Sequence, residues 1–250
     1  MFGALLAAAC LVVVIRRSER LAEERSRFAA AAAHELRTPL AGIRLHGEML
    51  ALALGNPTRV QEYAGRITDE AERLTRLVSN VFNYTQTDQK RLRIRKEVGD
   101  IGATVRRALE VMEPIVARLG GRLIVRVQDG LPPAEFDSDA VHQMVRNLVD
   151  NAEKYTRSSA DRRIEVDVAA KVGWIEISVR DHGDGVPAGQ RSRIFQAFSR
   201  HADDTETGGL GLGLSVVKTL ITAHGGRVEV RDAPGGGACF VLRLPLDPGV

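Results

Sequence analysis

The stretch AAHELRTPL at residues 32–40 is the part of the chain around which the rest is organised. A neutral histidine ring nitrogen can act as a nucleophile, and Glu35, next to His34, can hold or accept the ring proton. Thr38 lies one helical turn further on, so its hydroxyl points to the same side of a helix as His34 and Glu35. Pro39 removes a backbone donor from an otherwise helical pattern. A single histidine on a helix is usually an ordinary surface or core residue, so the rest of the sequence has to decide between the two interpretations.

Length and composition allow one or two folded domains and argue against several functions. The 250 residues suffice for domains with proper cores, and 44% hydrophobic and 27% charged residues are ordinary values for a folded protein. A formal net charge of +3 is too small to indicate nucleic acid as a partner, and no alternation of basic and aromatic residues suggests binding of single strands. Cys10 and Cys239 stand far apart, which argues against a disulfide framework or a zinc site and favours a reducing compartment.

Residues 1–15 form an uncharged, almost wholly apolar segment, and Arg16 and Arg17 follow directly. A helix of this length spans only about 22 Å, against a hydrocarbon core of about 30 Å. We expect residues 1–17 to be a short hydrophobic membrane segment, either compact or the end of a longer transmembrane helix. A signal-like or interfacial segment and a buried soluble helix are the alternatives. The two arginines would place the rest of the chain in the cytoplasm.

Two helices separated by a short turn are predicted next. In the helix that carries His34, apolar or small residues recur in steps of three and four at Leu36, Leu40, Ile43, Gly47, Leu50 and Leu54. The glycine, asparagine and proline at residues 55–57 predict a turn. The second helix has the same periodicity at Val60, Tyr63, Ile67, Glu70, Leu74, Leu77, Val81 and Tyr84. Only Glu70 interrupts this apolar seam.

An antiparallel hairpin of two such helices buries too little apolar surface to be stable alone. We therefore expect two hairpins to pair into a dimeric four-helix bundle, with residues 18–91 as the dimerisation domain. A monomeric hairpin that packs on the following domain is the alternative.

A second domain is expected at residues 92–250, after a polar linker at residues 86–91. Helices are predicted at residues 101–119, at 138–156 and after the glycines near residue 213. Strands are predicted at residues 92–96, 122–128, 134–136, 164–170, 174–181, 227–231 and 238–244. The pair at 164–170 and 174–181 should be antiparallel neighbours. This order of elements predicts an α+β fold in which helices cover a mixed sheet.

The helix at residues 138–156 offers a polar stripe. Asn147, Asn151 and Lys154 follow in steps of four and three and therefore share one face. Magnesium keeps several of its waters and needs few protein oxygens, so one amide carbonyl could suffice to bind it, beside phosphates. A solvated helix face would be the ordinary interpretation of this helix taken alone.

Two glycine-containing stretches follow. Asp181–Gly185 (DHGDG) comes at the end of a predicted strand, where a carboxylate can accept a hydrogen bond from a ring amine and glycines let the backbone approach a flat ring. Gly208–Gly213 (GGLGLG) opens a helix, where free backbone amides can bind phosphate. The second stretch is no P-loop, because no GKS or GKT closes it, and its spacing differs from the Rossmann fingerprint.

The order of these motifs resembles that of two-component sensor histidine kinases. The stretch HELRTPL is similar to their H box, Asn147–Tyr155 (NLVDNAEKY) to the N box and Asp181–Gly185 to the G1 box. Ile194–Phe198 (IFQAF) looks like the F box, and Gly209–Gly213 looks like the G2 box. The resemblance covers roughly residues 20–246. It implies a helical dimerisation and phosphotransfer domain, followed by an α/β sandwich of the GHKL ATPase type.

The resemblance also implies a role for each motif residue. His34 would be the phosphoacceptor, Glu35 would orient its ring, and Thr38 would serve a phosphatase activity. Asn151 would bind Mg²⁺ with support from Asn147. The remaining residues expected to contact or enclose ATP are Lys154, Tyr155, Asp181, Gly183, Gly185, Phe195, Phe198, Gly209, Gly211, Leu212 and Gly213. Of these, Asp181 would hold the adenine amine, and Phe195 and Phe198 would anchor the base of a mobile lid at residues 199–213.

The activity implied is autophosphorylation of His34 by ATP, followed by phosphotransfer to an aspartate of a response regulator. The chain would act as a homodimer attached to the bacterial inner membrane through residues 1–17. Two alternatives remain. The first is a GHKL ATPase; in those proteins a glutamate that activates water stands where this chain has Asn147, which argues against this alternative. A degenerate kinase that serves as a dimeric scaffold is the second. No recognisable input domain lies between Arg17 and His34, so the signal is not predicted.

Overall fold

The computed structural model describes residues 16, 29–30, 32–33, 35–53, 55–88, 94–197, 199 and 211–246. These fall into two compact units, a hairpin unit up to residue 81 and an α/β unit from residue 82 onward, which are treated separately here. The expected membrane segment, apart from Arg16, and the expected phosphoacceptor His34 lie outside the described residues. So do Phe198, Gly209 and nearly all of the expected lid before Gly211.

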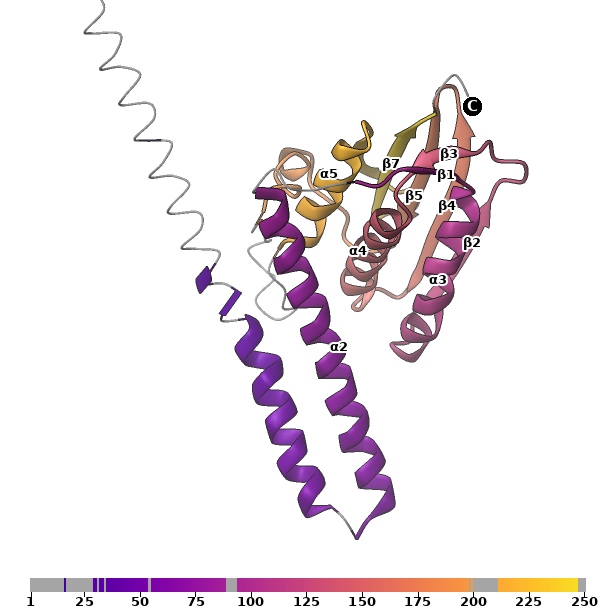
Figure 1. Cartoon of the computed structure of the whole chain (residues 1–250). Helices are drawn as coiled ribbons and strands as arrows, with labels where there is room; N and C mark the ends of the chain where they lie inside the picture. Colours follow the sequence, from indigo (N-terminus) through magenta and orange to yellow (C-terminus); the bar gives the residue numbers. More distant parts are fainter. Residues whose placement is uncertain are drawn as a thin grey trace, which may run out of the picture. The chain divides into compact units, whose positions relative to one another are not determined.

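The hairpin unit consists of helical residues 35–52 and of α2 (Pro57–Asp88), as predicted (Figure 1). Asn56 precedes α2, and its side-chain Oδ1 accepts a hydrogen bond from the Arg59 backbone amide at 3.2 Å. Such a cap satisfies one of the free amides of a helix start. Pro57 occupies the first helical position, where its missing donor costs nothing. The turn and the start of α2 therefore follow from local sequence.

The predicted seam of α2 lies inward, but the prediction for the first helix is partly wrong. Each described seam position of α2 is half-buried or buried, whereas Leu40 is 53% exposed. Other residues face α2 in its place: the ring of His46 stacks on Tyr63 with centroids 6.2 Å apart, and Gly42 lies against Glu70. The apolar residues of the first helix thus cover more than one of its sides. Large apolar side chains of this helix remain exposed at Leu40, Leu45, Met49 and Leu52.

The α/β unit has a five-stranded mixed sheet in the order β2-β4-β5-β7-β6 and a separate pair, β1-β3. The strands are β1 (Glu97–Gly99), β2 (Arg122–Val127), β3 (Ala134–Phe136), β4 (Arg163–Lys171), β5 (Trp174–Arg180), β6 (Arg227–Asp232) and β7 (Ala238–Pro245). The helices are α3 (Ile101–Arg118), α4 (Ser138–Thr156) and α5 (Gly213–Ala223), with a short 3-10 turn at Ala188–Gln190. β2 and β4 are parallel, and the other pairs of the sheet are antiparallel.

Helices α3, α4 and α5 lie on the same face of this sheet (Figure 1). Side chains alternate along a strand, so one set of strand residues faces the helices and the other set faces away. In β4, Ile164, Val166 and Val168 are buried in the core, whereas Glu165 and Asp167 belong to the opposite, charged face. The predicted α+β fold with a helix-covered mixed sheet is confirmed.

Two boundaries differ from the prediction by more than one residue. The first strand does not lie at residues 92–96, because its described part, residues 94–96, is irregular and β1 begins at Glu97. The strand pairs with β3, with Glu97 opposite Phe136. That partner is distant in sequence, so local propensity could not set the register. The helix α2 also continues to Asp88, into the stretch expected as a linker.

Within the described part of the chain, the helices are too short or too polar to cross a membrane.

Candidate functional site

Glu35 and Thr38, the described site residues of the HELRTPL stretch, lie in the first helix of the hairpin unit. Residues 35–40 are helical, so Glu35 and Thr38 are three positions apart on one side of the helix. Glu35 is only 8% exposed, while Thr38 is exposed to solvent. A buried carboxylate and an exposed hydroxyl on the same helix side can serve different partners, one within the protein and one outside it.

Helix α4 is amphipathic, and it carries the polar stripe on one side and a buried apolar surface on another. Asp137 caps its start, because its Oδ1 accepts a hydrogen bond from the Ala140 amide at 3.0 Å. The opposite side is buried in the core through Val141, Met144, Val145, Leu148, Val149 and Ala152. Asn147 is 8% exposed, and Asn151 is half-buried. The expected shared face of the stripe is therefore present.

The side-chain amide of Asn147 connects α4 to the start of α5. Its Nδ2 donates to the Gly213 carbonyl at 3.3 Å, and its Oδ1 accepts from Gln143 at 3.4 Å. Both ends of this amide are therefore used within the protein. The amide of Asn151, by contrast, makes no hydrogen bond with any residue that the structure describes, so its carbonyl oxygen is free to bind a magnesium ion. Asn151 thus fits a single protein ligand to Mg²⁺, which typically keeps several waters.

Lys154 and Tyr155 lie at the end of the same helix. The Lys154 ammonium lies over the Tyr155 ring, 4.7 Å from its centroid. This cation–π contact holds a positive charge at the end of the stripe. The pair can therefore offer a charge and a ring to a nucleotide.

Asp181 is the most buried carboxylate of the expected site, at 2% exposure. Its Oδ1 accepts hydrogen bonds from the Ala238 amide at 2.9 Å and from the Gly183 amide at 3.0 Å. Burial raises the pKa of Asp181 above its ordinary value, and these two amides act in the opposite direction. No described residue donates to Oδ2, so this oxygen remains available as an acceptor for a ring amine.

Glycines bring the backbone close around Asp181. A Cβ on Gly183 would lie 2.4 Å from the Tyr155 carbonyl oxygen, and Gly185 has a φ of +75°. A Cβ on Gly237 would lie 2.1 Å from the Asp181 carbonyl oxygen. The sequence analysis did not single out Gly237, although three consecutive glycines at residues 235–237 were the available signal. The turn between β6 and β7 therefore packs directly against the backbone of Asp181.

The described part of the second glycine-containing stretch lies at the start of α5. Gly211 has a φ of +64°, and Leu212 is 1% exposed. Leu212 is thus buried rather than open to solvent, while the carbonyl of Gly213 accepts the bond from Asn147. Phe195 is also a core residue, with its ring edge-on to Phe240 at 6.3 Å. Its position fits an anchor next to the expected lid more directly than a nucleotide contact.

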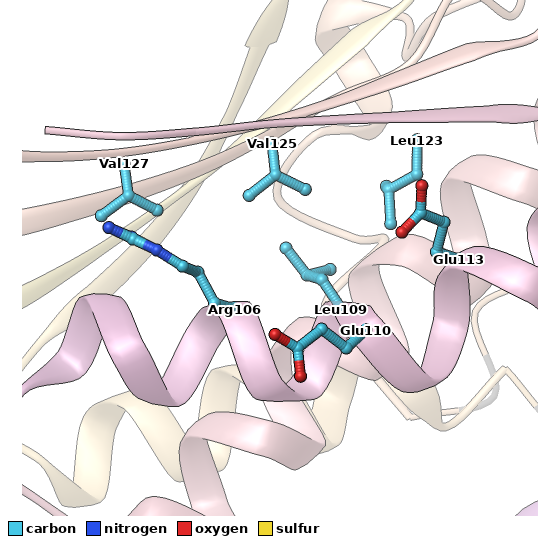
Figure 2. Close-up of a pocket in the computed structure, with 7 residues that line it drawn as sticks. All are labelled: Arg106, Leu109, Glu110, Glu113, Leu123, Val125 and Val127. Carbon is cyan, nitrogen blue, oxygen red and sulfur yellow. The ribbon is translucent and has the colours of Figure 1, made fainter.

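A hollow of about 380 Å³ lies elsewhere in the α/β unit, between α3 and the edge strand β2. Figure 2 shows the β2 side chains pointing toward α3 across it. Its lining consists of Arg106, Leu109, Glu110, Glu113, Leu123, Val125 and Val127, and none of these belongs to the expected nucleotide site. The site is therefore defined by the arrangement around α4, Asp181 and α5.

Two family models match separate parts of the chain. The model described as His Kinase A (phospho-acceptor) domain matches residues 24–90. The model described as Histidine kinase-, DNA gyrase B-, and HSP90-like ATPase matches residues 136–248. The first match contains the stretch around His34, and the second contains α4, Asp181 and the start of α5.

Similar proteins cover nearly the whole chain. The sensor protein KdpD of Escherichia coli (strain K12) is 31% identical over 233 residues, which make up 90% of this chain and 25% of KdpD. The sensor histidine kinase CpxA of the same strain is 31% identical over 97% of this chain and 51% of CpxA. The chain therefore spans between a quarter and a half of the length of these relatives. Among solved structures, full-length ShkA in complex with AMPPNP is similar with a TM-score of 0.62 and 28% identity, over 88% of this chain and 46% of that one.

Proposed function

Because the chain belongs to the two-component sensor histidine kinases, we propose that it transfers the γ-phosphoryl group of ATP to a ring nitrogen of His34 and then to an aspartate of a response regulator. The observation that carries this proposal is the assembly of Asn147, Asn151 and Asp181 with the start of α5 in one compact unit. A similar protein, ShkA, has been solved with AMPPNP, an analogue of ATP. Phosphoryl transfer requires positioning and charge neutralisation more than covalent help from the protein, and the unit offers both.

In this proposal each part of the nucleotide has its own contact. The Asp181 Oδ2 accepts a hydrogen bond from the adenine amine, since Oδ1 is already used. The backbone at the start of α5 and Lys154 bind phosphates. Asn151 holds Mg²⁺, which neutralises phosphate charge when bound. Asn147 keeps the start of α5 next to α4 and so positions the phosphate-binding amides relative to Asn151.

The nucleophile is a neutral nitrogen of His34. A bond forms between this nitrogen and the γ-phosphorus, while the bond from the γ-phosphorus to the bridging oxygen of ADP breaks. The proton of the attacking ring passes to Glu35, and ADP leaves. Glu35 is 8% exposed, which is consistent with a carboxylate that acts on a neighbouring ring rather than on solvent.

The experiment that tests the reaction incubates the full chain with γ-labelled ATP and Mg²⁺, with His34→Gln beside it. We expect acid-labile, alkali-stable label on the wild type alone. ATP binding without label on His34 would contradict the kinase proposal and favour a dimeric scaffold. Steady release of phosphate in His34→Gln would favour a GHKL ATPase. The amide of Asn147 cannot accept a proton from water, which argues against the GHKL ATPase.

We further propose that the chain dephosphorylates its response regulator through Thr38. The hydroxyl of Thr38 is exposed, on the same helix side as Glu35, where it could position a water against a phosphoaspartate. Thr38→Ala should then lose dephosphorylation and keep autophosphorylation. An equal loss of both activities would contradict this division of roles.

The proposed organisation has a membrane segment at residues 1–17, a dimerisation and phosphotransfer domain at 18–91 and a catalytic domain at 92–250. The uncharged residues 1–15, followed by two arginines, support attachment to the inner membrane with the catalytic parts in the cytoplasm. Resistance of the full chain, but not of a chain without residues 1–17, to extraction from membranes by alkaline carbonate would test this attachment.

A further inference from the structure

The charged face of the sheet ends at a histidine next to Asp181. Arg180 lies opposite Glu165 in the pairing of β4 with β5, and both side chains point away from the helices. Because successive residues of an extended chain point to opposite sides, Asp181 turns toward the helices and His182 turns back to the charged face. His182 therefore lies between the nucleotide site and the ion pairs of this face.

The His182 ring is held between two carboxylates. Its Nε2 lies 3.1 Å from Glu165 Oε1, and its Nδ1 lies 3.6 Å from Asp161 Oδ2. The side chain is only 11% exposed, which is unlike a freely solvated surface histidine. Since a carboxylate can only accept, the ring donates its Nε2–H to Glu165.

The carboxylate of Glu165 is itself fixed in place. Arg126 donates a short hydrogen bond to Glu165 Oε2, and Arg180 lies 3.6 Å from the same oxygen. The hydrogen bond from Arg126 keeps the pKa of Glu165 below its ordinary value, against the effect of burial. Glu165 is thus an ionised acceptor that two arginines from neighbouring strands hold in position, and it is a rigid anchor for the His182 ring.

The peptide unit between His182 and Gly183 is fixed at both ends. Its carbonyl accepts a short hydrogen bond from Ser159 Oγ, and its N–H donates to Asp181 Oδ1 at 3.0 Å. A rotation of this peptide plane would break both bonds. The ring of His182 is the third restraint, because it holds the Cα from which the plane begins.

We infer that His182 is a positioning residue of the nucleotide site. The contact of its ring with Glu165 keeps the 182–183 peptide in the orientation that fixes Asp181 Oδ1, so that Oδ2 faces the adenine amine. This inference rests on the proposed role of Asp181. Through His182, the charged face of the sheet would then affect how well Asp181 recognises the 6-amino group of adenine.

The test measures the dissociation constants of the full chain for Mg·ATP and for purine riboside triphosphate, which lacks the 6-amino group. In His182→Ala we expect ATP binding to weaken about tenfold, the effect of a lost hydrogen bond to a charged group, and binding of the analogue to change less than about twofold. The KM for ATP should rise, while the rate at saturating ATP stays the same. His182→Gln, whose amide can still donate to Glu165, should restore most of the discrimination.

Asp167→Asn is the matched control. Asp167 lies on the same strand and the same face as Glu165, and it pairs with the same two arginines, Arg126 and Arg180. It has no ion pair or hydrogen bond with His182 among the described residues. Its binding of both nucleotides should equal that of the wild type. If His182→Ala does not fold, Ser159→Ala removes the other restraint on the same peptide and should show the same selective loss. Suppose that the wild type prefers ATP to the analogue. If His182→Ala then loses binding of both nucleotides equally, or loses none, the inference about His182 is overturned and the role of Asp181 is not. A wild type that does not prefer ATP to the analogue would overturn the role of Asp181 as well.

Discussion

The two units of this chain differ in how completely they bury their apolar residues. In the described part of the hairpin unit the buried hydrophobic residues are Ala32, Ala53 and Leu77, while several leucines remain exposed. The α/β unit has one continuous core, to which α3, α4, α5, the five-stranded sheet and β3 all contribute. Burial of apolar surface is the main favourable contribution to folding. The described part of the hairpin therefore leaves apolar surface open to a further partner, whereas the described part of the α/β unit buries most of its own.

This difference separates the two halves of the proposed reaction. Glu35 and Thr38, which flank the proposed nucleophile in the sequence, belong to a helix with exposed apolar side chains, and the proposed nucleotide residues belong to a closely packed α/β unit. Substitutions in the α/β unit should therefore lower stability or nucleotide binding by disturbing close packing. Substitutions in the hairpin should mainly change how two copies of the chain associate. Four predictions test this distinction.

The largest effect is expected for Gly183→Ala in the α/β unit. The added Cβ would lie 2.4 Å from the Tyr155 carbonyl oxygen, and backbone cannot yield as a flexible side chain can. We expect a stability loss of about 2–3 kcal/mol and at least about a hundredfold weaker ATP binding, measured by thermal unfolding and calorimetry. Gly189→Ala is the control, since nothing lies within 4 Å of its added Cβ. Similar behaviour of both variants would contradict the close packing around Asp181.

The second prediction concerns Leu45, which is 55% exposed in the hairpin unit. If the hairpin pairs with a second copy, Leu45→Glu should bury a charge and weaken dimerisation at least about tenfold, as seen by light scattering at a series of concentrations. Val172→Glu is the matched change in the α/β unit, at a side chain that is fully exposed. It should leave the dimer intact. A dimer unaffected by Leu45→Glu would place the interface on another side of the hairpin.

The third prediction concerns pH and the buried His224. Its Nδ1 donates to the Leu220 carbonyl at 2.7 Å, and its Nε2 accepts from the Asp137 amide at 3.1 Å, so the ring is neutral. Burial lowers the pKa of His224 below its ordinary value. The unfolded chain therefore takes up the proton first, and the stability that this residue contributes is present above about pH 6.5 and is lost as the pH falls through the lower folded-state pKa.

The slope from this residue cannot exceed one proton, or about 1.4 kcal/mol per pH unit. Denaturant unfolding of the full chain between pH 7.5 and 5 should show it in the transition of the α/β unit. His224→Gln should remove this part of the slope. A slope that is unchanged in His224→Gln would mean that other groups cause the pH dependence.

The smallest effect is expected for Glu70 in the seam of the hairpin. Its buried Oε2 accepts no hydrogen bond from any described residue, and the Arg73 guanidinium is 3.9 Å away. Replacing a poorly paired, half-buried carboxylate by an apolar side chain often stabilises, so Glu70→Leu should raise hairpin stability by about 1 kcal/mol. The exposed Glu62→Leu, on the same helix, should be neutral. A destabilised Glu70→Leu would indicate that the carboxylate has a partner in the assembled bundle.

Much of the α/β unit could be predicted because its signals are local. The bounds of α4 agree with the prediction to the residue, since an aspartate cap and a regular apolar period specify them within one segment. The wrong positions were those that depend on distant partners. β1 follows its pairing with β3, and Leu40 is exposed because His46 and Gly42 occupy the side toward α2.

The sequence alone determined the motif residues, their order and the helices that carry them, because each motif and each helix signal lies within a short contiguous segment. The tertiary structure decided how those residues are held. Asp181 takes its orientation from Ala238 and Gly237, more than fifty residues away, and His182 takes its place from Glu165 on the neighbouring strand. Strand register and close backbone contact bring these groups together, and the local sequence does not show which distant residues will meet.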